Sequence, residues 1–239
     1  MSHVLLATSS PVSLGTLVAS RPASVKVLLR HRIDFWSNSQ RAIDEVCGMA
    51  GVSARSLMEE VASEEDVGGP DWDWSRSSLT TIVAMIVEEW HRPIEEALVR
   101  VHGRALACAR AAGDARTGEL ARILGVLRDD MVVHVQRQEC AIFPCIVDGN
   151  RLSPRIRSEL ADHSDAGVGR MLTRIRELTG NFQLPRDPVP GLRALWDGLA
   201  SLSTSLVEHI ALEAHVLYPR ALAGEDPRRA RPAASMAAC

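Results

Sequence analysis

Two short motifs, each beginning with a histidine, carry the side chains best suited to metal chemistry. His134 opens HVQRQECAIFPC and His209 opens HIALEAHVLYPR. Aligned, both read His, then Gln138 or Glu213 four residues later, then an aromatic residue followed by proline. Residues four apart lie about 40° apart around a helix, so each pair shares one face. Agreement at these fixed offsets predicts an internal repeat, and the prolines are expected to end both helices at the same height.

Each motif is preceded by a further helical segment with one histidine, in VEEWHRP and in LADHSDAG. A lone histidine on an apolar face is usually a hydrogen-bonded core residue, but four at symmetric positions favour ligands. Bundles hold pairs of transition metals in this way, and imidazole with carboxylate suits iron. The predicted metal ligands are His91, His134, Gln138, His163, His209 and Glu213.

The other four histidines are interpreted as structural or surface residues. His102 lies about 16 Å along the helix axis from His91, and His215 points away from the face that carries His209. His3 and His31 precede the bundle.

Helical periodicity dominates the elements that must position these side chains, and the chain is predicted to be all-α. Long helical patterns near 78–112, 116–140, 154–180 and 189–217, joined by short turns, predict a four-helix bundle. Shorter helical pieces are expected within 14–31, broken near Pro22, and at 53–63, capped by Ser53. The expected organisation is a small helical N-terminal domain (1–65), an acidic Gly/Pro linker (66–77), the bundle (78–224) and a loose tail (225–239).

Composition sets limits on partners and compartment. The 239 residues include 27 basic and 30 acidic side chains, and only 4% are aromatic, which gives no case for nucleic-acid binding. No apolar run is long enough to span a bilayer, and the N-terminus lacks a basic export signal. Five cysteines without a C-x-x-C pair favour a reducing compartment, so a cytoplasmic location is expected.

From residue 13 to 224 the sequence resembles the iron–sulfur cluster repair di-iron proteins, whose C-terminal domain is hemerythrin-like. The resemblance rests on LGTLVASRPASVKVLLRHRIDF (14–35), EEWH, ADHSDAG and EHIALEAHVLYPRALAGE, which fall in the family's order. It implies that His91, His134, His163, His209 and Glu213 are iron ligands in a non-haem two-iron site. It also implies a role in repairing clusters damaged by nitric oxide or oxidants, damaged iron–sulfur proteins as partners, and a homodimer formed through the N-terminal part.

The sequence departs from that family at the metal site and in the N-terminal part. Gln138 stands where the family has a bridging Glu, and Glu139, about 140° round the helix from His134, is expected to face another way. The lost charge predicts weak or unequal iron occupancy, or a stabilised ferrous form. Trp36 and Ser37 replace an adjacent Cys-Cys pair, which removes its thiol chemistry. Pro93 predicts a kink beside His91.

Three functions are compatible with these residues. The first is repair of damaged iron–sulfur clusters. The second is a hemerythrin-like sensor or scavenger that binds NO or O2 without repair activity, and the third is an NO-reducing enzyme that would require an electron donor.

Overall fold

A computed structural model describes residues 12–21, 24–64, 77–149, 152–161, 166–226 and 228–229. All regular elements in these ranges are helices, and the only β-type pairing among them is an isolated bridge between Ser13 and Ala42. The all-α prediction is confirmed. No helix in the described ranges has both the length and the apolar character that crossing a membrane requires.

The N-terminal part is built from short helices. They are α1 (Leu14–Ser20), α2 (Ser24–Arg30), α3 (Phe35–Asn38), α4 (Ile43–Ala50) and α5 (Ala54–Ser63). The pieces expected within 14–31 and at 53–63 are present, and the Ser53 hydroxyl accepts a hydrogen bond from the Ser56 N–H as the predicted cap. Pro22, where the break was expected, lies outside the described residues. Helices α3 and α4 were not anticipated, because such short elements carry little periodicity.

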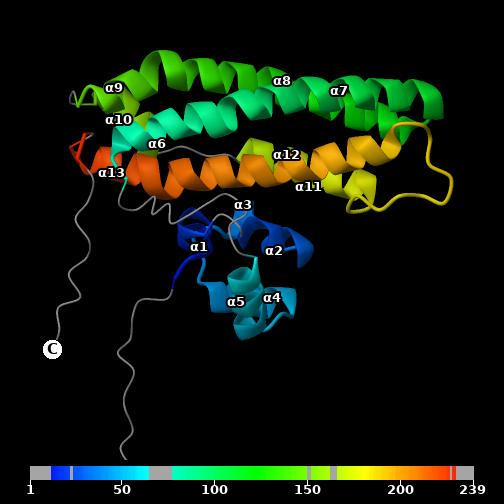
Figure 1. The fold of residues 1–239 in the computed structure, drawn as a ribbon, viewed down its shortest axis with the longest axis horizontal. Coiled ribbons are helices and arrows are strands. Elements are labelled where there is room, and N and C mark those ends of the chain that lie inside the picture. The colour runs from blue at the N-terminus through cyan, green and yellow to red at the C-terminus, as the bar shows by residue number, and fades with distance from the viewer. Residues whose placement is uncertain are drawn as a thin grey trace, which may run out of the picture.

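Four helical rods form the bundle. Their elements are α6 (Leu79–Met85), η1 (Ile86–His91) and α7 (Arg92–Ala112); α8 (Ala115–Arg137), η2 (Gln138–Ile142) and α9 (Phe143–Val147); α10 (Pro154–Ala161) and α11 (Ala166–Thr179); and α12 (Leu192–Leu212), η3 (Glu213–Leu217) and α13 (Tyr218–Leu222). Figure 1 shows the rods running along the long axis of the molecule. The helix positions were predicted correctly, but the second and fourth rods continue through 147 and 222.

Each of η1, η2 and η3 is a π-helical segment followed by a proline two residues on. Pro93, Pro144 and Pro219 have no N–H to donate, and the residue before each proline donates to the carbonyl five residues earlier. The wider π turn accommodates the proline ring inside a continuous helix, a device common at functional sites. The expectation that Pro144 and Pro219 end their helices was therefore wrong. Beside His91, the irregularity expected at Pro93 takes the form of a π turn.

Two apolar clusters fill the bundle, one on α7, α8, α11 and α12 and the other on the π segments and the helices at their end of the bundle. One contains Leu98, Leu124 and Leu199, the other contains Ile86 and Leu217, and Trp90 packs against both. The polar side chains described below lie between these clusters.

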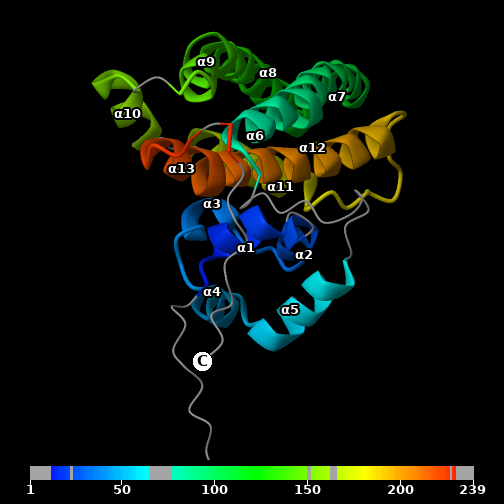
Figure 2. The same cartoon turned by 60° about the vertical axis from the view of Figure 1, so that its left-hand side comes forward.

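The N-terminal helices pack on the α11–α12 side of the bundle, as Figures 1 and 2 both show. Their core includes Val207 and Ala211 of α12, and α1 also contacts η3. The approach is close at Gly15, where an added Cβ would stand 2.0 Å from the His215 ring. The boundary of the N-terminal domain remains a prediction, since residues 65–76 lie outside the described part, as does most of the expected tail.

Candidate metal centre

The candidate ligands meet where the π segments begin or end. His91 is the last residue of η1, while Gln138 and Glu213 are the first residues of η2 and η3. His134 and His209 lie in the last turns of α8 and α12. The repeat in the sequence is thus also a repeat in the structure. The second and fourth rods each place a histidine on the final α turn and the residue four positions later on a π turn.

This cluster is almost completely removed from solvent. His91, His209 and Glu213 are 0% exposed, and Gln138 is 1% exposed. His134 is less enclosed, with 23% of its side chain accessible. Burial of so many polar groups is costly unless they are satisfied by one another or by a ligand.

The three fully buried side chains converge on one small volume. The Nε2 atoms of His91 and His209 are 3.2 Å apart, and His209 Nε2 lies 3.2 Å from Glu213 Oε1. One donor atom from each of these residues fits within 4.8 Å of the others. Two imidazole nitrogens on neighbouring corners of one transition-metal ion, with bonds of about 2.1 Å, would be roughly 3 Å apart. The observed separation therefore suits a shared ion.

His134 approaches the same carboxylate from the opposite side. Its Nε2 lies 3.7 Å from Glu213 Oε2, and its ring meets His209 edge-on, with ring centroids 5.8 Å apart. Glu213 thus lies between two histidines, one at each oxygen. A carboxylate in this position can join two metal positions.

Gln138 faces the cluster through its amide group. Its Nε2 donates to Glu213 Oε1 at 2.6 Å and to the Tyr218 hydroxyl at 2.5 Å. Gln138 Oε1 and Glu213 Oε2 are buried, and no described residue forms a hydrogen bond with either atom. The prediction that Gln138 lies with the ligands in space is consistent with this geometry, but its N–H groups, not its oxygen, point at the carboxylate.

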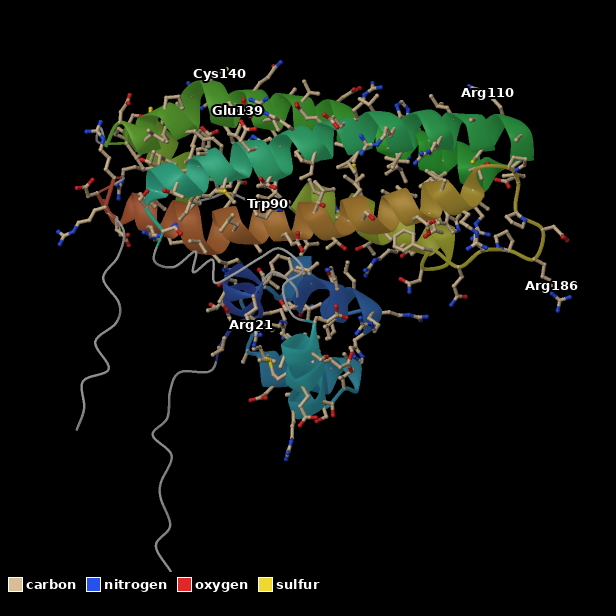
Figure 3. All side chains as sticks on the ribbon, in the orientation of Figure 1. Arg21, Trp90, Arg110, Glu139, Cys140 and Arg186 are labelled. Atoms are coloured by element: carbon tan, nitrogen blue, oxygen red, sulfur yellow. The ribbon has the colours of Figure 1, made fainter. Side chains whose placement is uncertain are left out.

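Glu139 reaches the cluster from its outer side. Its Oε1 lies 2.8 Å from Nδ1 of the buried His91, although its own side chain is 37% exposed. In Figure 3 Glu139 and Cys140 lie together on the α8–η2 rod, towards the end of the bundle opposite Arg110. Glu139 was expected to face another way than His134, and the structure adds a contact that was not predicted, with the His91 ring that projects from η1.

The protonation states favour a metal-ligating set. Burial would raise the pKa of Glu213, but the neighbouring His209 and His134 outweigh burial, and the pKa lies well below its usual range. Burial and the neighbouring His209 lower the pKa of His91, and the hydrogen bond that its Nδ1–H donates to Glu139 opposes them. At neutral pH the site therefore presents a carboxylate and a neutral imidazole, which are the forms that bind cations.

Aromatic residues of the repeat close the site and were not assigned a role from the sequence. His91 stacks on Phe143, with ring centroids 5.6 Å apart and planes inclined by 10°. Tyr218, at the matching position of the second motif, is 2% exposed and accepts the hydrogen bond from Gln138. The aromatic-proline step shared by both motifs is the sequence signal from which these positions could have been identified.

The remaining histidines fall where they were expected or outside the described part. His163, a predicted ligand, lies outside the described residues, as does His3. His102 Nδ1 is 3.0 Å from Arg128, and His31 pairs with Glu60. His215 points away from the cluster, towards Phe35. Its pKa is lowered by burial.

Comparisons with known proteins agree with this site. The family model described as hemerythrin HHE cation binding domain matches residues 81–221. The chain is also similar to the iron–sulfur cluster repair protein YtfE of Yersinia pestis (strain Pestoides F), with 28% identity over 225 residues, covering 89% of this chain and 97% of that protein. The protein of the same name from Yersinia pseudotuberculosis serotype O:1b (strain IP 31758) gives the same identity and coverage. The resemblance identified from the motifs is confirmed.

Proposed function

Because the chain belongs to the hemerythrin HHE cation-binding domain family, we propose that it is a non-haem iron protein that takes part in the repair of damaged iron–sulfur clusters. The observation that carries the proposal is the buried triad of His91, His209 and Glu213, whose donor atoms lie within 4.8 Å of one another. The similarity to repair proteins over 89% of the chain supports the same role.

The proposed ligand set combines the triad with residues on its borders. His91, His209 and Glu213 would hold one ion, and His134 would belong to a second position that shares Glu213. His163 is proposed as a ligand of the second position from its place in the sequence alone. Imidazole and carboxylate ligands suit ferrous and ferric iron.

Iron bound here would supply redox-active coordination positions open to NO or O2 and an ion that can be released to a client cluster. The protein's own side chains would control the access of small ligands to the iron and the retention of the ion. Phe143 covers one face of His91, Glu139 fixes the orientation of that ring, and Tyr218 with Gln138 holds the Glu213 carboxylate in place.

We further propose that the two iron positions are unequal. Gln138 contributes no negative charge, and its amide N–H groups already bond to Glu213 and Tyr218. The position on the His91 side would therefore bind tightly, and the position on the His134 side would bind weakly. A weakly held ion suits transfer to a damaged cluster in the cytoplasm under nitrosative or oxidative stress.

Restoration of a damaged cluster enzyme tests the proposal directly. An iron–sulfur dehydratase inactivated by NO is mixed anaerobically with the Fe(II)-loaded protein, and recovery of dehydratase activity is followed. We expect recovery with the native chain and its loss in His209→Ala and Glu213→Ala. His102→Ala, which alters a bundle histidine outside the site, is the matched control and should restore activity as the native chain does.

A second function, an NO or O2 sensor or scavenger without repair activity, is favoured by one observation. Trp36 and Ser37 cannot supply thiols for contact with, or electron transfer to, a client. If the native chain binds NO through its iron but does not restore the dehydratase, the sensing function replaces the repair function. Production of nitrous oxide in the same mixture would instead identify an NO-reducing enzyme.

A further inference from the structure

We propose that a cavity between the N-terminal helices and the bundle binds a small organic anion with an apolar body, whose head group pairs with Arg176. This cavity is separate from the candidate metal centre, and its proposed ligand goes beyond the function given above.

The cavity has a volume of about 460 Å³ and opens where the α2–α3 turn faces α11 and α12. Leu29 and Phe35 line it from the N-terminal side, and Leu172 and Val207 line it from the bundle. A neighbouring cavity of about 550 Å³ shares Leu29, Arg176 and Asn181 with it. These volumes fall within the range of small-molecule sites, which combine apolar walls with a few polar groups.

Arg176 supplies the polar group common to both cavities. Its side chain is half-buried, and burial lowers its pKa, partly offset by the charge of Asp34. In the described part of the chain no ion pair or hydrogen bond joins the guanidinium to another side chain, and Asp34 acts on it through its charge. A partly desolvated cation gains from a charge-assisted hydrogen bond, which a bound anion would supply.

The balance of available charge around the two cavities favours an anion. Arg32 and Lys26 also line them, and in the described part of the chain neither side chain has an ion-pair partner. The acid Glu177 is already paired with Arg174 at 2.8 Å, and neither Asp34 nor Glu208 is free of partners. Apart from the paired Glu177, the lining of the two cavities carries three basic side chains (Lys26, Arg32 and Arg176) and two acids (Asp34 and Glu208), so the balance of charge is positive.

The backbone around the cavities is held in an unusual conformation. Arg32, Asn181 and Phe182 have φ angles of 58°, 58° and 63°, and they are the non-glycine residues with positive φ in the described ranges. All three border one of the two cavities. Such conformations cost about 1–3 kcal/mol each and are maintained only where the surrounding structure imposes them. The cavity walls are thus fixed by packing, which favours a preformed site.

The binding test uses the full chain and two fluorinated probes of matched shape. 4-Fluorobenzoate carries a carboxylate and 4-fluorobenzyl alcohol does not, and the binding of each is followed by the broadening and shift of its ¹⁹F resonance. We expect 4-fluorobenzoate to bind and the alcohol to bind at least about tenfold more weakly, since a charge-assisted hydrogen bond is lost.

Two substitutions locate the binding. Arg176→Met should weaken 4-fluorobenzoate binding about tenfold or more, while Arg170→Met, at an exposed position of the same helix, should leave it unchanged. Thr173→Trp, at an exposed residue that lines the cavity, should block it by occupying the space.

Equal binding of both probes, or binding of 4-fluorobenzoate that survives Arg176→Met, overturns the proposal. If Arg176→Met does not fold, as judged by circular dichroism, the test rests on Thr173→Trp. Undiminished binding of 4-fluorobenzoate by that variant also overturns the proposal. Iron content is measured in parallel, and because neither altered residue touches the metal cluster it should not change. Loss of iron would mean that the two sites are not separate.

Discussion

The Glu139 carboxylate lies 2.8 Å from Nδ1 of His91, a ring that is itself fully buried. With Nδ1 engaged by the carboxylate, the lone pair on Nε2 is directed at His209 and Glu213. A carboxylate behind a ligating imidazole fixes the tautomer and raises the basicity of the ring, and loss of such a partner typically costs about 10- to 100-fold in metal affinity.

Glu139→Gln is therefore expected to weaken binding of the first ferrous ion about 10- to 100-fold. Competition against a chelator of known affinity measures the effect without reference to activity. Glu88→Gln, which removes a surface carboxylate paired with Arg92, is the control and should leave affinity unchanged. An affinity in Glu139→Gln equal to that of the native chain would show that the hydrogen bond to His91 has no role in metal binding.

Gln138→Glu should lower the stability of the metal-free protein and strengthen its binding of iron. Without metal it places a second carboxylate against Glu213, where the amide now donates at 2.6 Å, and we expect a loss of roughly 2–3 kcal/mol. With iron the added charge should increase both stoichiometry and affinity at the weaker position. Thermal melting with and without Fe(II), together with iron counting, checks both halves. Tight loading of two ions in the native chain would contradict the proposed inequality.

The metal-free protein should lose stability as the pH falls from 8 to 4. The folded-state pKa of Glu213 lies well below its usual range, so its stabilising contribution is present above the unfolded value of about 4.3 and declines as pH falls towards the folded value. The lowered pKa of His91 acts with the same sign at higher pH: the unfolded ring takes up a proton below about 6.5 while the folded ring resists it.

Melting temperature measured against pH checks this prediction. We expect His91→Gln to flatten the decline between pH 7 and 5.5, and Glu213→Gln to flatten the part below pH 5. A decline unaltered by both substitutions would place the responsible groups elsewhere.

Gly15→Ala should loosen the N-terminal helices from the bundle. The added Cβ would stand 2.0 Å from the His215 ring, and overpacking of this kind typically costs about 1–3 kcal/mol. Urea unfolding and limited proteolysis of the native and altered chains measure the loss. Gly48→Ala is the matched control, since that helical glycine has nothing within 4 Å of its added Cβ. It should gain up to about 1 kcal/mol from helix propensity. An equal response of both variants would rule out close packing at Gly15.

The bundle and the spacing of its histidines could be read from the sequence because both depend on local periodicity. His134 with Gln138 and His209 with Glu213 are pairs four residues apart. Each pair still faces the same cluster although the helix changes there from α to π turns. The π segments themselves could not be predicted, since one added residue per turn barely alters a 3.6-residue pattern. Proline was consequently interpreted as the end of a helix at Pro144 and Pro219, where the structure continues.

Contacts between rods could not be predicted from local sequence patterns. Glu139 meets His91 across 48 positions of sequence, and Gln138 reaches Tyr218 across 80. The approach of Gly15 to His215 depends on the docking of whole helices, for which the sequence holds no periodic signal. The side-chain types were visible in each case, but their partners were set by tertiary packing.

The π segments also divide the bundle for the purposes of protein engineering. Three of its rods change register at the level of the metal centre, so the turns beyond that level have a helical phase of their own. The distal half, built on Leu98, Leu124 and Leu199, can accordingly be shortened or redesigned in matched helical turns without rotating His91, His209 or Glu213. A compact metal-binding scaffold would retain the helical turns next to the metal centre, the three prolines and the π segments, and would replace the rest.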